Sequence, residues 1–600
     1  MKIKEGKLLR INLTAQTTKE EGIDPQLIKN FIGGRGLGTK FFYDEVDPNI
    51  DPFSESNKLI FANGLLTGTD APTGGRYMVI TKGPLNETIA SSNSGGVFGA
   101  VLRKAGYYLI IIEGKSKYPV YLHISNDNVE FKDASHLWGL NTHNTTDKII
   151  EEIGEKGTRV ACIGPAGEKL VKLAAIINEK HRAAGRSGVG AVMGSKNLKA
   201  LAVKGTNKIE SEDKDAFSTE VKASIEKIRK HPVTSEGLPA LGTKILDSII
   251  NENGLYPTKN FQFSTFEFCE EVNGEALVNK GYLKKNKACF ACPISCGRET
   301  QLPSGRKGEG PEYESGWALG ANCGVKDLIA ITEANFICNE LGLDTISAGA
   351  TIAAAMELYE KGLIKKEELN NGPELKFGSS EAVVYYTRQM ALREGFGDKL
   401  AEGSFRLTQS YGHPELSMSV KKQELPAYDP RVVQGLGLNY ATSNRGGCHV
   451  RGYMISPEVL GIPEKLDPLE LEGKPKWVMI FQDLTALIDS CGLCLFTSFA
   501  LGLEDYTKLI NAATGYNFSI EQALQAGERI WNLERLFNIK AGFTAKDDTL
   551  PRRLLEDPIP DGPQKGAVSK VETLIPQYYK VRGWNEDGTI PTKKLDELEL

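Results

Sequence analysis

The pattern of hydrophobic and polar positions changes once along the chain, at a charged junction over residues 210–215. Before the junction, short apolar runs are separated by Gly, Pro and Asn, which is typical of β-strands joined by turns. The predicted strands are residues 7–13, 77–81, 108–113 and 159–163. After the junction, apolar residues recur at the spacing of helix faces. We therefore predict a β-rich N-terminal domain followed by mostly helical domains.

Two consecutive helices are defined by their end signals. One apolar helix face is formed by Leu328, Ile331, Ala334, Ile337 and Leu341. Gly342 is placed to end this helix, and Asp344 is placed to cap the next one, over residues 345–356. Residues 421–447 are predicted to be loop-rich and to divide the helical region near residue 417. The predicted domains are therefore residues 1–208, 209–416 and 417–600.

Composition and charge exclude several classes of protein. The 600 residues include 72 Lys and Arg against 77 Asp and Glu, a net charge of −5, whereas a general nucleic-acid binder needs a basic face. The longest apolar run, residues 107–112, is far shorter than the ~20 residues of a membrane span. The charged N-terminus lacks the apolar stretch of a secretory signal. We expect a cytoplasmic enzyme without a membrane span or a nucleic-acid partner.

Five of the ten cysteines fall into two tight groups, which points to metal binding rather than to disulfides. Cys289-x2-Cys292-x3-Cys296 forms the first group, and Cys491 and Cys494 form the second. A short loop with three thiolates and a distant fourth suits an iron–sulfur cluster. Zinc held by the two Cys-x2-Cys pairs is the alternative, but it leaves Cys296 without a role. The spacing favours the cluster.

Three glycine-rich segments are candidates for binding phosphate. They are residues 33–38, residues 91–96 with Arg76 upstream, and residues 181–194. Glycines allow backbone amides to approach phosphate oxygens, and the neighbouring arginines neutralise their charge. None of the segments ends as a P-loop does. Three such segments in one domain favour a cofactor that carries phosphate.

A short internal repeat and a few titratable residues complete the candidate chemistry. The pattern [Asp/Asn]-x-x-Gly-Leu-[Asp/Cys] begins at Asn339 and again at Asp489, and each copy is either a plain helix end or a ligand-binding turn. His449 follows two glycines, which makes it a candidate active-site residue. Glu312 and Glu314 are predicted to lie in an exposed turn before a helix.

In their combination and order, these motifs resemble the tungsten-dependent aldehyde:ferredoxin oxidoreductase family over nearly the whole chain. The most specific parts are residues 182–190, the three-cysteine loop and the two Gly-Leu turns, the second of which ends at Cys494. The resemblance implies an α+β multidomain fold, in which a β-rich N-terminal domain forms the base for the cofactor and two mostly helical domains cover it. It also implies a tungsten (or molybdenum) bis-pterin cofactor, a [4Fe–4S] cluster and Mg²⁺.

The resemblance assigns roles to residues at matching positions. The pterin phosphates and Mg²⁺ would be held by Arg76, Asn93, Gly95, Arg182, Ala183, Gly185 and Arg186. The pterin rings would be met by Asn339, Leu343, Asp344, Asp489 and Leu493, with Arg445, Gly446 and Arg451 near the cofactor. The cluster would be bound by Cys289, Cys292, Cys296 and Cys494, and Cys491 would be a bystander. The catalytic residues would be His449, to polarise a carbonyl or move a proton, and Glu314, to accept a proton.

The implied partners are a small-molecule aldehyde and either ferredoxin or an iron–sulfur subunit, because the chain has one cluster motif and needs an outside acceptor. An oligomer is expected. Two positions depart from the family pattern. Asn339 stands where the family has Asp, and Glu333 matches one ligand of an interface iron, whereas no histidine occurs between His231 and His413 to supply the other.

Alternative functions remain open at this point. A related class reduces aromatic acyl-CoA rings with a cysteine at the tungsten, and Cys323 is the candidate for that role. A non-catalytic zinc-stapled scaffold, an electron-transfer subunit with a cluster alone, and a nicotinamide or flavin dehydrogenase are the others. His449 beside two glycines favours aldehyde chemistry.

Overall fold

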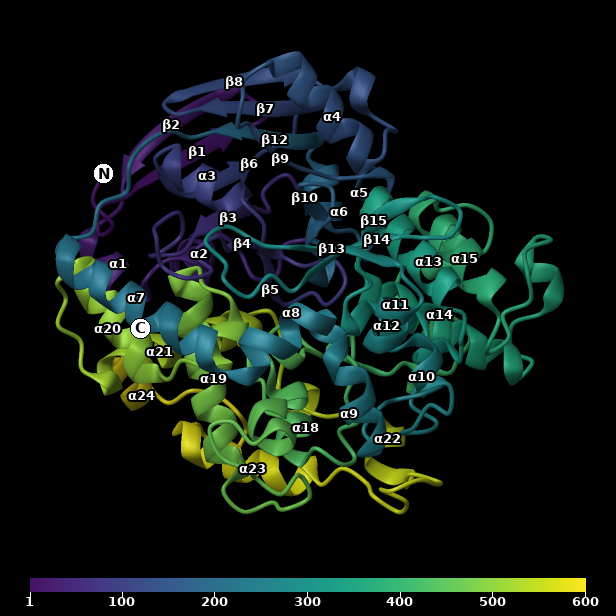
Figure 1. Cartoon of the computed structure of the whole chain (residues 1–600). Helices are drawn as coiled ribbons and strands as arrows, with labels where there is room; N and C mark the ends of the chain where they lie inside the picture. The colour runs from purple at the N-terminus through teal and green to yellow at the C-terminus, as the bar shows by residue number, and fades with distance from the viewer.

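The N-terminal part of the chain is a sandwich of two six-stranded sheets (Figure 1). The computed structural model describes all residues, 1–600. The first sheet has the order β2 (Thr17–Gly22), β1 (Lys7–Asn12), β6 (Tyr107–Glu113), β3 (Leu59–Asn63), β4 (Tyr77–Lys82), β5 (Ile89–Ser94). The second has the order β11 (Arg182–Ala184), β10 (Ile176–Asn178), β9 (Arg159–Cys162), β12 (Leu198–Lys204), β7 (Val120–Ser125), β8 (Asn128–Asp133). The four predicted strands correspond to β1, β4, β6 and β9 and are confirmed.

Alternation of side chains along the strands explains the layers. Ile110 and Ile112 of β6 face the core between the sheets, while Leu109 and Ile111 face the helical part of the molecule. Successive strand residues point to opposite faces, and both faces of this sheet are apolar because both are covered. The N-terminal helices are α1 (Pro25–Phe31), α2 (Gly34–Glu45), α3 (Phe98–Lys104), α4 (Thr142–Ile153), α5 (Pro165–Glu168) and α6 (Val189–Ser195). The inner strands of the β-rich base are thus buried, whereas the edge strand β2 is largely exposed and the edge strand β8 is half-buried.

The middle part of the chain is mostly helical, with one small sheet. Its helices are α7 (Lys214–Lys230), α8 (Leu238–Leu241), α9 (Leu246–Glu252), α10 (Cys269–Val272), α11 (Gly274–Asn279), α12 (Tyr313–Leu319), α13 (Leu328–Leu341), α14 (Thr345–Glu360), α15 (Ser380–Leu392), α16 (Gly397–Leu400) and α17 (Ser404–Ser410). The sheet consists of β13 (Leu283–Lys287), β14 (Gly297–Gln301) and β15 (Lys307–Glu309). The cysteine loop connects β13 to β14, so the sheet anchors both ends of that loop.

The C-terminal part is helical apart from a two-stranded ribbon, β16 (Ser419–Val420) and β17 (Gln423–Glu424). Its helices are α18 (Gln434–Thr442), α19 (Lys474–Cys491), α20 (Leu503–Thr514), α21 (Ile520–Lys540), α22 (Arg552–Glu556), α23 (Val571–Arg582) and α24 (Thr592–Leu598). Helix α19 packs on α2 and α21, beneath the first sheet. No helix in the chain combines the length and the apolar character needed to cross a membrane.

The prediction for residues 421–447 is partly wrong, because the segment contains helix α18. All nine residues of α18 are buried, so the helix has no polar face and leaves no helical periodicity in the sequence. The predictions for α13 and α14 are confirmed. Gly342 ends α13 with φ 79°, and the side chain of Asp344 accepts hydrogen bonds from the Ile346 and Ser347 amides at the start of α14.

The two Gly-Leu turns dock on the N-terminal sandwich through backbone hydrogen bonds. After α13, Asp344 N–H donates to the Leu173 carbonyl at 2.9 Å. At the end of α19, the Leu66 amide donates to the Cys491 carbonyl at 2.8 Å, and the Arg76 amide donates to the Gly492 carbonyl at 3.2 Å. Both turns are therefore fixed against the base, one on each side of the space between them.

We expect Gly64→Ala to weaken the packing of the second Gly-Leu turn on the N-terminal sandwich. A methyl group at Gly64 would lie 2.1 Å from the Gly492 nitrogen and 2.3 Å from the Cys491 carbonyl carbon. Backbone atoms cannot yield at such distances, so we expect a loss of about 1–3 kcal/mol in the free energy of unfolding, measured by denaturant titration. Gly22→Ala is the matched control, because nothing lies within 4 Å of its added methyl. Equal midpoints for both variants would contradict the expected close packing.

A candidate active site next to a four-cysteine cavity

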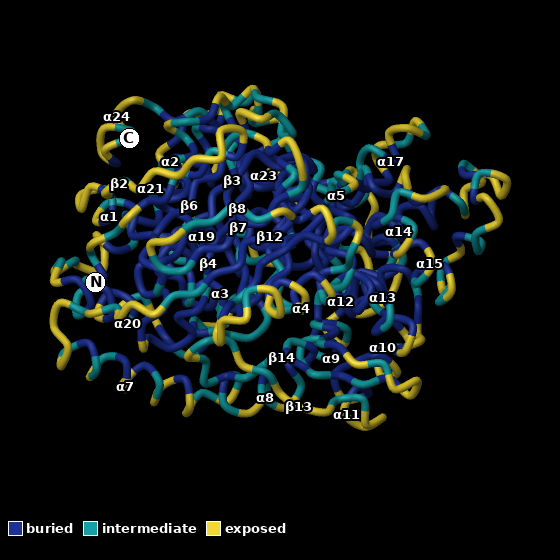
Figure 2. Tube along the Cα trace, turned by 90° about the horizontal axis from the view of Figure 1, so that it is seen from above, coloured by how far each residue is buried: buried dark blue, intermediate teal, exposed yellow.

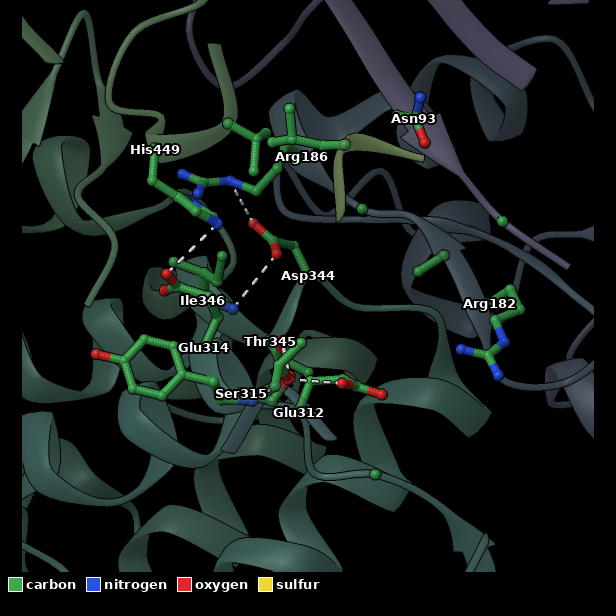
Figure 3. Close-up of a pocket in the computed structure, with 18 of the residues that line it drawn as sticks. Asn93, Arg182, Arg186, Glu312, Glu314, Ser315, Asp344, Thr345, Ile346 and His449 are labelled. Carbon is green, nitrogen blue, oxygen red and sulfur yellow. Dashed lines mark hydrogen bonds and ion pairs between the residues drawn. The ribbon is translucent and has the colours of Figure 1, made fainter. Parts of the chain in front are cut away.

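The main candidate site is the large cavity, of about 390 Å³, where the three parts of the chain meet. Its walls come from β5 and the segment 181–186, from the start of α12 and the turn between α13 and α14, and from the segments 445–453 and 489–496. Figure 3 shows side chains from several of these elements around the cavity, among them Glu314 of α12, Asp344 before α14 and His449. Since no single part of the chain forms the cavity, its chemistry depends on how these parts pack together.

One wall carries an acid–imidazole pair. The Oε1 atom of Glu314 lies 3.5 Å from Nε2 of His449, and the Ala427 amide donates to Oε2 of Glu314 at 3.0 Å (Figure 3). Burial raises the pKa of Glu314 to about 8. Burial, together with the charges of Arg186 and Arg445, holds the pKa of His449 well below its usual value. At neutral pH both groups are therefore uncharged, and a proton can pass between them and a bound molecule.

The cavity wall is also rich in arginine. Arg186 forms an ion pair with Asp344, with Nε 3.1 Å from the carboxylate, and its Nη2 donates to the Glu424 carbonyl at 2.6 Å. Arg182 pairs with Glu309 at 3.1 Å. The same Asp344 caps α14, so the carboxylate fixes both a helix end and an arginine. Positive charge arranged in this way suits an anionic ligand.

A buried ionic network supports the second Gly-Leu turn. Asp489 forms ion pairs with Arg451 and with Arg35, the latter at 3.4 Å, and accepts a hydrogen bond from Asn93 at 3.2 Å. Arg35 is bound in turn by Glu534 at 2.7 Å. The network holds the end of α19 against β5 and α2, so the position of Asp489 is determined by three separate elements.

The second cavity adjoins the first and is lined by four cysteines: Cys289, Cys292, Cys296 and Cys494. Arg76 and Arg182 line both cavities. Nη2 of Arg76 donates to the Cys494 sulfur at 3.2 Å, while its Nη1 donates to Asn93 at 2.9 Å. A single arginine thus contacts a thiol on one side and the wall of the large cavity on the other.

The cysteine set fits a cluster better than a pair of zinc-binding Cys-x2-Cys motifs. Cys491 lines neither cavity and is fully buried in the core at the end of α19. Cys296, which the zinc alternative leaves without a role, lines the four-cysteine cavity. All ten cysteines are free thiols. The zinc-stapled alternative is therefore wrong in its choice of residues.

The large cavity also contains buried polar atoms that have no hydrogen-bond partner within the protein. Nδ1 of His449 and Nδ1 of His181 are buried and have no hydrogen-bond partner in the protein, although buried polar atoms are nearly always paired. Both histidines line the cavity, together with the four arginines Arg76, Arg182, Arg186 and Arg445. Unpaired polar atoms beside clustered cations are the features expected of a site for an anionic cofactor.

The structure brings most of the predicted site residues together. Those that line the large cavity are Arg76, Asn93, Gly95, Arg182, Ala183, Gly185, Arg186, Cys289, Cys296, Glu314, Asn339, Leu343, Asp344, Arg445, His449, Asp489 and Cys494. Cys292 lines only the second cavity. Gly446, Arg451 and Leu493 line neither cavity. Arg451 lies behind the wall, where it holds Asp489 and the Ser91 carbonyl.

Two expectations about position are corrected. Glu314 does not lie in an exposed turn, because it belongs to the first turn of α12 and is only 14% exposed. The glycine-rich segment 33–38 does not line either cavity. It starts α2, where a methyl at Gly34 would lie 2.5 Å from the Asp489 carbonyl oxygen. Its glycines therefore serve close helix packing rather than phosphate binding.

Several lining residues were not predicted from the sequence. Tyr428 and Tyr453 contact His449 with ring centroids 5.8 and 6.1 Å away, and their hydroxyls are 3.2 Å apart. His181 packs edge-on against His143 at 4.8 Å. Single aromatic residues in loops carry no periodic signal. His181 alone had a usable signal, because it is the first residue of the predicted phosphate-binding segment 181–194, although no role was assigned to it.

An acid–imidazole pair, clustered arginines and an adjoining four-cysteine cavity together define an enzyme that combines an anionic cofactor with a metal cluster. Two family models match this chain and identify the class. The model described as "Aldehyde ferredoxin oxidoreductase, N-terminal domain" matches residues 8–205, and "Aldehyde ferredoxin oxidoreductase, domains 2 & 3" matches residues 219–600. The chain belongs to the aldehyde ferredoxin oxidoreductase family, and it has the multidomain fold of that family.

Individual relatives agree with the family models. The "Tungsten-containing aldehyde ferredoxin oxidoreductase" of Pyrococcus furiosus is 57% identical over 99% of this chain and 98% of its own length. The protein of the same name from Thermococcus kodakarensis is 56% identical with the same coverage. Among solved structures, the "Active site complex BamBC of Benzoyl Coenzyme A reductase in complex with 1,5 Dienoyl-CoA" is similar with a TM-score of 0.87. It is 27% identical and covers 100% of this chain and 98% of its own.

Proposed function

We propose that the protein oxidises aldehydes to carboxylic acids with water and passes the electrons through a [4Fe–4S] cluster to ferredoxin. The observation that carries this proposal is the neutral Glu314–His449 pair, which faces the arginine-lined cavity beside the four-cysteine cavity. The names of the relatives at 56–57% identity support it.

The cavity residues provide for a tungsten (or molybdenum) bis-pterin cofactor. Arg76, Arg182 and Arg186 would hold its phosphates, with Mg²⁺ between them as the family resemblance implies. The two Gly-Leu turns would present Asp344 and Asp489 to the two pterins. Asn339, in place of the family's Asp, offers an amide whose Nδ2 donates to the Glu309 carbonyl at 3.3 Å. One pterin would therefore meet the neutral amide of Asn339, whereas the other pterin would meet the carboxylate of Asp489 at the matching position of the second turn.

The reaction releases two electrons and two protons when an aldehyde and water form a carboxylic acid. The bound metal cofactor supplies the two-electron redox chemistry. The chain supplies the proton handling: neutral His449 can donate a hydrogen bond to the carbonyl, and Glu314, when deprotonated, can accept a proton. Tyr428 and Tyr453 pack against His449 and orient its ring.

The contacts of Arg76 support a short electron route between the cavities. Its guanidinium is in hydrogen-bond contact with both Cys494 and Asn93. The cluster cysteines and the cofactor cavity therefore share a wall, with no intervening protein layer.

The acyl-CoA reductase alternative has no support in the position of Cys323. This thiol is fully buried, lines neither cavity, and lies 3.4 Å from the carbonyls of Ala318 and Gly349. Burial raises its pKa far above the usual value. A cysteine in such surroundings is a core residue.

Elemental analysis and a dye assay test the proposed function together. Protein purified anaerobically from cells supplied with tungstate and molybdate should contain about one tungsten or molybdenum and about four iron atoms per chain. It should reduce a viologen dye when an aldehyde is added. Zinc alone, or a fully metal-loaded protein without aldehyde-dependent dye reduction, would contradict the proposal.

Two further predictions follow from the family resemblance. We expect an oligomer in the cytoplasm, without the interface iron. Glu333, the residue that matches one of its ligands, forms an ion pair with Arg306. Its carboxylate is thus already bound by a cation of this chain.

A further inference from the structure

The four-cysteine cavity lies close to the protein surface on the side of β13. Ala288 and Ala291 of the cysteine loop are exposed, and Cys289, Cys292 and Cys296 are half-buried. Figure 2 shows β13 and the adjoining β14 at one edge of the molecule, with β13 largely exposed. An electron on a cluster in this cavity would therefore be close to solvent on this side.

Lysines surround this point. We define the basic surface as Lys104, Lys180, Lys285, Lys287 and Lys307. A surface cleft of about 560 Å³ includes Lys180, Lys287 and Lys307, and it shares Arg182 and Lys287 with the four-cysteine cavity. Lys104 places its Nζ 4.9 Å from the ring centroid of Phe290 in the cysteine loop.

Much of this positive charge is not neutralised within the protein. Lys287 pairs with Glu299 at 2.8 Å, and Lys180 pairs with Asp147 at 2.7 Å. Lys104, Lys285 and Lys307 form no ion pair. The whole chain has a net charge of −5, so the basic surface is a local exception at the place where electrons would leave.

The surface also lacks the features of a permanent interface. The exposed large hydrophobic side chains of the protein are Tyr118, Ile150, Val278, Ile329, Tyr385, Leu469, Ile520 and Val581. None of them lies in the cysteine loop or in the sheet β13–β15. Obligate interfaces are large and apolar at their centre, whereas transient electron-transfer contacts are small and polar.

We propose that the basic surface is the docking site of a mobile, acidic iron–sulfur carrier of the ferredoxin type, rather than of a permanently bound subunit. The inference rests on the proposed function and specifies where on the surface the electron carrier docks. Each aldehyde oxidised yields two electrons, and each oxidised carrier takes one, so two carriers must bind and leave per turnover. Charge attraction speeds repeated encounters of this kind without holding the product complex.

Charge reversal on the basic surface tests the proposal. The variant Lys285→Glu/Lys307→Glu changes two exposed lysines that take part in neither cavity's chemistry. We expect the KM for an acidic ferredoxin to rise about 10-fold or more, since steering changes association rates by 10–10³-fold. The rate with a viologen dye, which needs no protein interface, should stay within about twofold of wild type.

The matched control is Lys565→Glu/Lys593→Glu, because both lysines are exposed, form no ion pair and lie in the C-terminal part of the chain. Raising the salt concentration should increase the ferredoxin KM of wild type and of the control, and should affect the Lys285/Lys307 variant far less. A ferredoxin KM that is the same in the Lys285/Lys307 variant as in the wild type, or a wild-type KM that does not depend on salt, would overturn the proposal. So would an iron–sulfur subunit that stays bound through a high-salt wash. Loss of viologen activity in the wild type would instead contradict the proposed function itself.

Discussion

Replacing Glu314 by glutamine is expected to lower kcat for aldehyde oxidation by about 10²–10⁴-fold, the range for loss of a general acid or base. The substitution keeps the size of the side chain and the hydrogen bond from the Ala427 amide, but glutamine cannot accept a proton. Steady-state kinetics with a viologen acceptor measures the effect. Metal analysis of the same sample should give wild-type tungsten and iron.

The pH dependence of the wild type gives an independent check. Burial raises the pKa of Glu314 to about 8, so its carboxylate form is scarce below pH 8 and dominant above it. His449 stays neutral over the same range, because its pKa lies well below the usual value. We therefore expect kcat to rise about tenfold per pH unit below pH 8 and to level off above it, and this rise should disappear in Glu314→Gln.

Glu312→Gln is the matched control for Glu314→Gln. Glu312 also lines the large cavity, but its carboxylate accepts a hydrogen bond from the Thr243 hydroxyl at 2.7 Å and makes no contact with His449. We expect a much smaller loss of kcat and an unchanged pH profile. Equal losses for the two variants, or full turnover in Glu314→Gln with intact metal content, would remove Glu314 from the reaction.

The second large effect is expected for Cys494→Ala. This residue lines the four-cysteine cavity and is contacted by Arg76. Without it a [4Fe–4S] cluster lacks its fourth ligand. The iron content should therefore fall from about four atoms per chain, and aldehyde-dependent reduction of both viologen and ferredoxin should drop to background.

Cys491→Ala distinguishes a ligand from a neighbouring thiol. Cys491 is three residues away and fully buried in the core, so its loss should leave the iron content and turnover unchanged at a stability cost of about 1 kcal/mol. If Cys491→Ala lost iron and Cys494→Ala kept it, the assignment of the fourth ligand would be wrong.

Local signals explain which parts of the fold were predictable. Gly342 and Asp344 determine a helix end and a helix start through their own backbone and side-chain chemistry, so both were readable from the sequence. Four strands of the sandwich, β1, β4, β6 and β9, were readable because apolar runs broken by turn residues are also local, whereas the pairing of the strands was not predicted. Helix α18 was not, because a helix buried on all sides lacks polar positions.

The parts of the site that consist of local sequence motifs were predictable. The parts that depend on contacts between segments distant in the chain were not. The cysteine spacing identified the lining of the four-cysteine cavity, and two of the glycine-rich segments identified part of the lining of the large cavity. The neutral state of Glu314, in contrast, is created by burial among segments distant in the chain, which outweighs the opposite effect of the hydrogen bond from the Ala427 amide, more than a hundred residues later. The contact of Tyr428 and Tyr453 with His449 likewise appears only when the segments 428–453 fold back on α12.

The separation of the cluster ligands along the chain has a consequence for biosynthesis. Cys296 and Cys494 are 198 residues apart. At synthesis rates of ~5–20 residues per second, about 10–40 s pass between their emergence from the ribosome. During this interval every nascent chain carries three cluster thiols without the fourth. The oxidants present while the protein is being made, and not only those met by the finished enzyme, therefore determine how many chains can be loaded.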